Sequence, residues 1–317
     1  MINKSSKIFI AGHNGLVGNA VFRKLKSERY KKLIFANRKK LDLLDLKKVE
    51  KFFALKKPDF LIICAAKVGG ILANKNYQLE FLLNNLNIQN NLLIAAKKYN
   101  IKRTIFLGSS CIYPKKSKIP IKEEYLMTGK LEKTNEAYAI AKIAGIKHCS
   151  ILFEQFNCDV ACVMPTNVYG INDNFDIGSS HVIPGLISKF LDAKKMNKDV
   201  TVWGSGKAIR EFLHVDDLAS AIIKILTIDK NKLKKIFHNK IPIFNVGSSE
   251  SVSIKKLANM IKGITKFKGK VIFDKSYPDG TLNKNLDCIK IKKINWKPKI
   301  KLHAGLNKVI KEREKIE

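Results

Sequence analysis

The sequence predicts an α/β protein in which a doubly wound parallel sheet carries a smaller α/β lobe. Short apolar runs rich in Ile, Val, Leu and Phe alternate with longer amphipathic stretches through the first half of the chain, which is the pattern of βαβ units. A glycine-rich segment directly follows the first run, as at a strand-to-helix turn. After Pro165 the alternation becomes irregular, which indicates a second, smaller unit.

The first half predicts five parallel strands with helices between them. The strands are expected at Lys7–Ala11, Leu33–Ala36, Phe60–Ala65, Thr104–Leu107 and Val160–Met164. The two longest amphipathic stretches, Tyr77–Tyr99 and Glu136–Phe156, are expected to be helices. Right-handed crossovers between parallel strands place such helices on both faces of the sheet.

The second half predicts a mixture of elements. A loop is expected over Asn167–His181. The other expected elements are helices at Val182–Ala193, Val215–Thr227 and His303–Arg313, a helix after Ser253, and strands at Val200–Trp203, Ile243–Val246 and Lys270–Phe273. We therefore expect residues 1–168 and 214–246 to form the larger domain, and residues 169–213 and 247–317 to form the smaller lobe.

The composition is that of a folded protein, since the 317 residues are 45% hydrophobic and 27% charged. No run of about 18 apolar residues occurs, so no membrane span is expected. The N-terminal residues lack a signal-peptide pattern, and the cytoplasm is the expected location. The six cysteines include no CxxC pair, which argues against a zinc site or a disulfide framework, and no metal site is expected.

The net charge of +33 does not by itself indicate nucleic-acid binding. Of the 60 basic residues only six are arginines, and the lysines are dispersed without interleaved aromatic residues. A nucleic-acid surface would instead concentrate basic residues in a patch or a motif. We expect no nucleic-acid partner, although a field of this sign would favour the approach of an anionic small molecule.

The glycine-rich segment has the GxxGxxG spacing of a phosphate-binding turn in a Rossmann-type fold. It comprises Gly12, His13, Asn14, Gly15, Leu16, Val17 and Gly18. Its glycines permit a tight turn, a close approach of the backbone to a pyrophosphate, and close packing of the helix on the strand. The N-terminus of the helix supplies unpaired N–H groups to the phosphate. The larger domain is therefore expected to bind a dinucleotide.

The end of the second expected strand favours NADP(H) over NAD. An NAD-binding domain places Asp or Glu there to bind the ribose 2′-hydroxyl, whereas this chain has Ala36-Asn37-Arg38-Lys39. Arg38 can pair with a 2′-phosphate. Asp42 is a candidate for a contact with the adenine, and it is equally placed to begin the next helix. We expect NADP(H) as the cofactor.

Three residues predict proton transfer to a carbonyl group that is being reduced. Tyr138 and Lys142 lie four residues apart on an expected helix, so they share one face. A tyrosine hydroxyl titrates near pKa ~10, and a neighbouring ammonium favours its ionised form. Ser109 follows the fourth expected strand, where its hydroxyl can bond the same substrate oxygen. Together the three groups can protonate an alkoxide as it forms.

These residues together resemble the extended short-chain dehydrogenase/reductase family over most of the chain. The matching strings begin with FIAGHNGLVG at residue 9 and continue through FLGSSCIYP, YAIAKIAGIK, MPTNVYG, SHVIP and REFLHVDD to PDGT, which ends at residue 281. SSCIYP and SHVIP are the most specific, because general relatives lack the Cys and the His at these places. Within the family, the strings are similar to those of epimerase-reductases that act on a GDP-linked 4-keto-6-deoxy sugar.

The resemblance implies inversion of the sugar at C3 and C5 and its reduction at C4 with NADPH. It implies that Cys111 is the base and His181 the acid for the inversions. A 4-keto group acidifies the neighbouring C–H bonds, and the enolate places charge on the oxygen near Ser109 and Tyr138. The further cofactor contacts implied are Leu107, Gly108, Lys142, Pro165, Thr166, Asn167, Val168 and His181.

The resemblance also implies substrate contacts by Lys189, Trp203, Arg210 and Asp279. Arg210 suits a diphosphate, because a guanidinium presents a planar fork of donors. Lys189 stands where the family has arginine, so a point charge replaces a fork. Trp203 precedes a glycine and is equally consistent with an anchor for a turn. The family implies a GDP-sugar substrate and a homodimer through the two long helices.

Two other readings stay open. One is a different sugar-nucleotide epimerase or dehydratase of the same family, although dehydratases usually carry Thr and two acidic residues where this chain has Ser109-Ser110-Cys111. The other is a non-catalytic NADP-binding or nucleic-acid-binding module. The second interpretation is disfavoured, because the chain has both Ser109 and Cys111. It also has Tyr138, Lys142 and His181.

Overall fold

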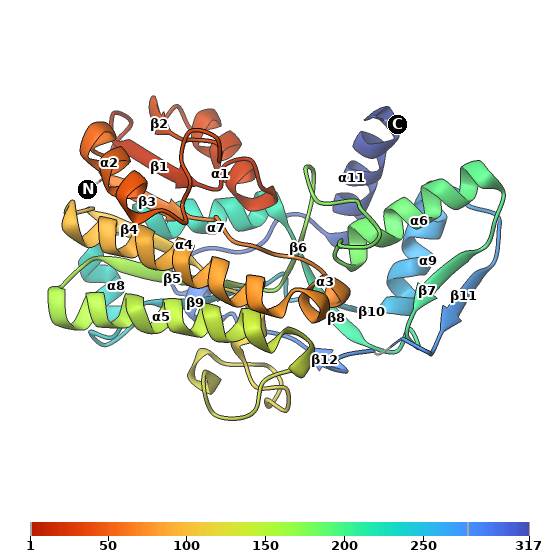
Figure 1. Cartoon of the computed structure of the whole chain (residues 1–317). Coiled ribbons are helices and arrows are strands. Elements are labelled where there is room, and N and C mark those ends of the chain that lie inside the picture. Colours follow the sequence, from red (N-terminus) through yellow and green to blue (C-terminus); the bar gives the residue numbers. More distant parts are fainter. Residues whose placement is uncertain (1, 278, 317) are drawn as a thin grey trace.

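A computed structural model describes residues 2–277 and 279–316, so Pro278 of the PDGT string and the expected domain limits at residues 1 and 317 lie outside the described residues. A six-stranded sheet forms the centre of the larger part of the molecule, in the order β2-β1-β3-β4-β5-β9 (Figure 1). The strands are β1 (Lys7–Ala11), β2 (Lys32–Ile34), β3 (Phe60–Ile63), β4 (Arg103–Leu107), β5 (Val160–Pro165) and β9 (Ile243–Val246).

All neighbouring strands of this sheet are parallel, and the expected doubly wound arrangement is confirmed. From β1 the chain first passes to β2 at one edge and then returns to β3 on the other side of β1, after which β4, β5 and β9 follow outward. The order of the strands therefore reverses between β1 and β3. Ligands of open α/β sheets bind at such a point, beyond the carboxyl ends of the strands.

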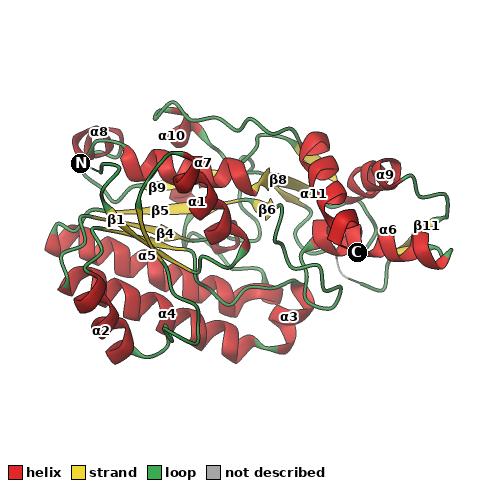
Figure 2. Cartoon of the chain, turned by 90° about the horizontal axis from the view of Figure 1, so that it is seen from above, coloured by secondary structure: helices red, strands yellow, loops and turns green. Residues whose placement is uncertain are grey.

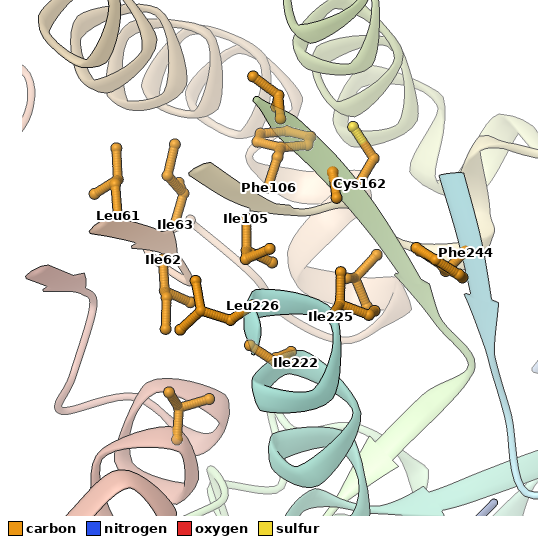
Figure 3. Packing of buried hydrophobic residues seen from close by; sticks show 14 of the residues in the cluster. Leu61, Ile62, Ile63, Ile105, Phe106, Cys162, Ile222, Ile225, Leu226 and Phe244 are labelled. Carbon is orange, nitrogen blue, oxygen red and sulfur yellow. The ribbon is translucent and has the colours of Figure 1, made fainter. Parts of the chain in front are cut away.

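Helices cover both faces of the sheet, as Figure 2 shows. The helices on one face are α2 (Leu46–Lys56), α4 (Gln78–Lys98) and α5 (Glu136–Phe156), and those on the other are α1 (Leu16–Ser27) and α7 (Val215–Thr227). The central strands are buried on both sides, which is why they read as continuous apolar runs. In Figure 3, Ile62 and Ile105 point toward α7, whereas Ile63 and Phe106 point toward the opposite layer.

A second apolar core lies in the smaller part of the molecule, on the right of Figure 1. Its helices are α6 (Val182–Met196), α9 (Ile254–Thr265) and α11 (Leu302–Ile316), with the two-stranded sheet β7 (Val200–Trp203) and β11 (Val271–Asp274). A further sheet joins the two parts. It consists of β10 (Ser251–Ser253), β8 (Ile209–His214) and β12 (Asn283–Lys284), and β6 (Asn167–Tyr169) also pairs with β8.

Several elements were not expected from the sequence. The segment expected to be a loop from Asn167 begins with β6, and β8 was not anticipated at all. Leu286 and Trp296 pack in the larger core, so this stretch does not share the core of the smaller lobe to which the sequence assigned it. Other unexpected elements are the strands β10 and β12, the helices α3 (Ile71–Asn76), α8 (Lys230–Ile236) and α10 (Ile289–Lys292), and three short 3-10 turns at Ser110–Ile112, Glu123–Tyr125 and Lys133–Asn135.

Three general features bear on the class of protein. Within residues 2–277 and 279–316, no helix combines the length and the apolar composition that crossing a bilayer requires. All six cysteines are free thiols. In the same part of the chain, no group of three His, Cys, Asp or Glu side chains is arranged to hold a metal ion.

Candidate active site

A cavity of about 370 Å³ opens beyond the carboxyl ends of the central strands, where the strand order reverses. Small-molecule sites typically enclose about 300–1,000 Å³. The expected site residues in its walls are Gly15, Leu16, Val17, Gly18, Leu107, Gly108, Ser109, Cys111, Tyr138, Lys142, Pro165, Thr166, Asn167, Val168, His181 and Arg210. The fold therefore brings together most of the residues that the sequence singled out.

The glycine loop is shaped by contacts that two of its glycines make possible. Gly12 has a φ of +88°, and a Cβ built on it would lie 2.6 Å from the Ala65 nitrogen. A Cβ on Gly18 would lie 2.1 Å from the Gly12 carbonyl oxygen. Gly15 is different, because its Cβ would meet that oxygen at an ordinary 3.6 Å. Gly15 caps α1 without a side-chain bond, so the first N–H groups of the helix are available to a phosphate.

Some expected cofactor residues lie outside the cavity walls. The His13 ring packs on Phe35 with their centroids 4.8 Å apart, and Asn14 is exposed. Arg38 is exposed beyond β2 and makes no hydrogen bond or ion pair with the described residues. Asp42 accepts a hydrogen bond from the Leu44 N–H at 3.1 Å, which makes a local turn before α2.

The residues that the sequence predicts to serve the reduction lie where α5 meets the end of β4. Lys142 is buried, its Nζ donates to the Leu107 carbonyl oxygen at 2.8 Å, and it lies 5.8 Å from the centre of the Tyr138 ring. Burial lowers the pKa of Lys142 to about 8, against the opposing effect of Cys111. Burial raises the pKa of Tyr138. The tyrosine hydroxyl is therefore protonated at neutral pH, as a proton donor must be.

Cys111 lies in the 3-10 turn directly after β4. Its N–H donates to Ser109 Oγ at 3.3 Å, and only 6% of the residue is exposed. Burial raises the pKa of the thiol, and the positive charges of Lys284 and Lys142 oppose this rise. The thiol is consequently protonated in this structure.

His181 caps the N-terminus of α6 without a hydrogen bond from its side chain, and it lines the same cavity as Cys111. Desolvation by the cavity walls lowers the pKa of His181, so its imidazole is neutral at pH 7. A basic cysteine and an acidic histidine therefore require one proton to pass from the thiol to the imidazole. The product of that transfer is a thiolate–imidazolium pair.

Two expected substrate residues form an aromatic cluster outside the cavity walls. The rings of Trp203 and Tyr277 stack with centroids 4.8 Å apart and an angle of 11° between their planes. Lys189 Nζ lies 4.2 Å from the centre of the Trp203 ring and donates to the Thr201 carbonyl oxygen at 2.9 Å. The cluster thus presents a cation and two flat rings on one surface of the smaller lobe.

The other two expected substrate residues are joined by a hydrogen bond. Arg210 lines the cavity and donates from Nη2 to the Asp279 carbonyl oxygen at 2.9 Å. The Asp279 carboxylate accepts from the N–H of Ser205 at 2.8 Å and from its hydroxyl at 2.6 Å. Its observed contacts thus hold the turn at Gly204, whereas Arg210 keeps donors available to a ligand.

Comparison with known proteins agrees with this geometry. Residues 8–247 match the model of the NAD dependent epimerase/dehydratase family. The chain belongs to this family. It is 48% identical to "Putative GDP-L-fucose synthase 2" of Arabidopsis thaliana over 97% of this chain and 91% of that protein. It is 44% identical to "GDP-L-fucose synthase" of Escherichia coli (strain K12) over 95% of this chain and 94% of that protein.

A solved structure is also similar along its whole length. The GDP-mannoheptose C4 reductase MlghC of Campylobacter jejuni, solved with NADP bound, has a TM-score of 0.87 and 33% identity. The match covers 99% of this chain and 100% of that chain. The sequence-based expectation of an extended short-chain dehydrogenase/reductase is thereby confirmed.

Among the cavity residues that were not anticipated from the sequence, five carry an amide, carboxylate or ammonium side chain. They are Asn74, Glu132, Asn135, Asp173 and Lys284. Lys284 lies on β12 and acts electrostatically on Cys111, and burial lowers its own pKa. Its only sequence signal is that it follows the PDGT string by three residues. Asn74 and Asp173 lie in segments with no such signal, because only the fold brings them to the cavity.

Proposed function

We propose that this chain is a GDP-L-fucose synthase. It would convert GDP-4-keto-6-deoxy-D-mannose to GDP-L-fucose by inversion at C3 and C5 and by reduction at C4 with NADPH. One observation carries the proposal: Cys111 and His181 line the same cavity as Ser109, Tyr138 and Lys142. A reductase needs only the last three, whereas an epimerase also needs a base and an acid near the carbon next to the carbonyl. The names of the plant and bacterial relatives support it.

The residues of the larger part fit a dinucleotide diphosphate. A side chain at Gly18 would collide with the loop, and the first N–H groups of α1 face the cavity with no capping side chain. Arg38 follows β2 and pairs with none of the described residues, which supports NADP(H) rather than NAD(H), since a guanidinium binds a phosphate with two parallel hydrogen bonds. When bound, NADPH supplies the hydride for C4. We assign the cofactor to residues 1–168 and 214–246, and the GDP-sugar to the smaller lobe.

In the reduction, the Tyr138 hydroxyl gives its proton to the C4 oxygen while Ser109 donates a hydrogen bond to the same oxygen. The ammonium of Lys142 stabilises the negative charge that the tyrosine then carries. The raised pKa of Tyr138 keeps this proton in place until the C4 oxygen becomes basic. One proton from the protein and one hydride complete the alcohol.

In each inversion, the Cys111 thiolate removes the proton on carbon, and the His181 imidazolium returns a proton to the opposite face. The intermediate enolate carries its charge on the C4 oxygen, where the donors that serve the reduction also stabilise it. Lys284 and Lys142 favour the thiolate, since both charges lower the pKa of Cys111. Epimerisation and reduction thus share one oxyanion site.

We also propose a homodimer through α4 and α5 and a cytoplasmic location. Both helices expose large apolar side chains, namely Leu83 and Ile94 on α4, and Ile140 and Ile151 on α5. These two helices pack side by side on one face of the sheet, so a second copy could cover both. A nucleotide-linked substrate and NADPH are consistent with the cytoplasm.

A second candidate is a C4 reductase of a GDP-sugar that performs no inversion. The protonation states of two cavity residues favour this candidate. Cys111 is protonated and His181 is neutral, so without a proton transfer the first cannot act as a base or the second as an acid. The similar C. jejuni structure is named as a C4 reductase of a GDP-sugar.

Oxidation of NADPH, followed by absorbance, tests the proposal when GDP-4-keto-6-deoxymannose is generated from GDP-mannose by a dehydratase. Substrate-dependent loss of absorbance with GDP-L-fucose as product is expected. An un-epimerised 6-deoxy sugar would favour the second candidate. If no NADPH is consumed, both candidate functions are wrong.

A further inference from the structure

Three residues of the cavity walls each have a buried side-chain oxygen with no hydrogen-bond partner among the residues that the structure describes. These oxygens are Asn74 Oδ1, Asn135 Oδ1 and Asp173 Oδ2. Buried acceptors are nearly always satisfied, because an unpaired one is unfavourable. Unpaired acceptors in the wall of a ligand cavity therefore indicate that the ligand supplies the donors.

The free atom of Asn74 is defined by its other hydrogen bonds. Asn74 lies on α3 and is only 6% exposed. Its Nδ2 donates to the carbonyl oxygens of Gly69 at 2.8 Å and Gly70 at 3.0 Å. Because the amide nitrogen has two donors and both are used, the orientation of the amide is fixed. Oδ1 is then the atom left for a ligand.

Asp173 lies on the segment 170–181, which passes across the cavity and carries His181 at its end. A Cβ on Gly170 would lie 3.6 Å from Leu16 Cδ1, and the Gly70 N–H donates to the Ser179 carbonyl oxygen at 2.9 Å. The segment therefore runs from the start of α1 to the start of α3. One Asp173 oxygen accepts from the Asn174 N–H at 2.8 Å, and the other is free. Burial raises the pKa of this carboxyl to about 7.

The cavity thus has two kinds of polar wall. The N–H groups of α1 and the guanidinium of Arg210 are donors, which suit phosphate oxygens because these only accept. Asn74 Oδ1 and the ionised carboxylate of Asp173 present acceptors, which a phosphate cannot satisfy. Hydroxyl groups can satisfy them, since each has one proton to donate.

We propose that Asn74 and Asp173 form a hydroxyl-binding subsite of the cavity. The inference rests on the proposed function in that it takes the ligands to be NADPH and a GDP-sugar. Both carry hydroxyls near the reacting carbon, on the nicotinamide ribose and on the sugar ring respectively. The subsite selects a polyhydroxylated ligand and orients it against Tyr138, and it takes no part in proton transfer.

Dissociation constants measured by calorimetry test this subsite without any turnover, so the result does not depend on the proposed reaction. The probes are NADPH, GDP-mannose and GDP, which lacks the sugar. The variants are Asp173→Ala and Asn74→Ala, compared with Asp176→Ala as a matched control. Asp176 is exposed on the same segment, bonds Ser179 Oγ and does not line the cavity.

We expect Asp173→Ala and Asn74→Ala to raise the dissociation constant of one ligand about tenfold, which is the effect of one lost hydrogen bond to a buried acceptor. The control should change that dissociation constant by less than about twofold. Weaker binding of NADPH alone assigns the hydroxyls to the ribose. Weaker binding of GDP-mannose but not of GDP assigns them to the sugar. No change, or an equal loss for all three ligands or in the control, would overturn the proposal.

Asn74→Asp separates recognition from a structural role of Asn74. This variant keeps an acceptor oxygen but loses the donors to Gly69 and Gly70. We expect it to bind the affected ligand better than Asn74→Ala does. If Asn74→Asp binds as weakly as Asn74→Ala, Asn74 acts only by holding the turn before α3, and the subsite is refuted.

Discussion

Lys142 Nζ donates a hydrogen bond to the Leu107 carbonyl oxygen at 2.8 Å, which ties α5 to the carboxyl end of β4. This contact links the helix that carries Tyr138 to the strand end that precedes Ser109. It also holds a cation inside the cavity wall, where burial makes the charged form costly. Lys142 therefore loses its proton at a lower pH than an exposed lysine does.

The rate of NADPH oxidation should consequently decline at alkaline pH. The pKa of Lys142 is lowered to about 8, so the ammonium is present below this pH and is lost above it. We expect kcat to fall about tenfold for each further pH unit, as for the loss of one essential proton. Lys142→Arg keeps a cation throughout, because guanidinium does not deprotonate in proteins. A pH profile of Lys142→Arg with the same alkaline decline would contradict this assignment.

Replacement of Cys111 should separate the two halves of the reaction. Cys111→Ser is expected to slow formation of the inverted product by about 100-fold or more, while some reduction survives. The reason is that a serine hydroxyl stays protonated and is a far weaker base than a thiolate. Product analysis by NMR distinguishes the sugars. Cys64→Ser is the control, since Cys64 also lines the cavity but has no role in the mechanism. Normal GDP-L-fucose formation by Cys111→Ser would exclude the thiol as the base.

Two alanine variants of the glycine loop should differ in their effect on the stability of the protein. Gly18→Ala places a methyl 2.1 Å from the Gly12 carbonyl oxygen, and we expect about 1–3 kcal/mol lower stability and little NADPH binding. Gly15→Ala places its methyl at 3.6 Å, so its Tm should stay near that of the unmodified protein while NADPH binding weakens. Thermal denaturation and NADPH fluorescence measure the two effects. Equal Tm values for both variants would show that the loop relaxes around either methyl.

Arg38→Ala should reduce the preference for NADPH over NADH. Loss of a charge-assisted contact with the 2′-phosphate is expected to raise the KM for NADPH about tenfold or more and to leave that for NADH nearly unchanged. Lys31→Ala removes one charge from the opposite end of β2 and serves as the control. An equal rise in both KM values, or the same rise in Lys31→Ala, would place the 2′-phosphate elsewhere.

The elements that the sequence predicted best are those with uninterrupted apolar patterns. The expected limits of β1, β7, β9, α5 and α7 agree with the structure. The strand β8 escaped prediction because Arg210 and Glu211 interrupt its apolar pattern. Glu211 is only 1% exposed, and its carboxylate accepts from the N–H groups of Ser249 and Leu286. These partners are distant in the sequence, so only the folded chain explains a charge at that position.

The site likewise contains residues that the sequence could predict and residues that it could not. Residues next to the ends of the central strands, such as Ser109 and Cys111, could be placed from the sequence because strand order fixes where those ends lie. Lys284, Asn74 and Asp173 reach the cavity from β12, α3 and a long connecting segment, whose paths depend on tertiary packing. Trp203, Lys189 and Asp279 were implied by resemblance alone, and they lie outside the cavity walls described above.

The most direct test of a shared site for inversion and reduction is the isotopic composition of the product formed in D₂O. With GDP-4-keto-6-deoxymannose and unlabelled NADPH, a base and an acid at C3 and C5 replace both of those hydrogens by solvent deuterium, while C4 receives unlabelled hydride. We predict GDP-L-fucose with deuterium at C3 and C5 and none at C4 by NMR. A reduced product without deuterium at C3 or C5 would contradict the account.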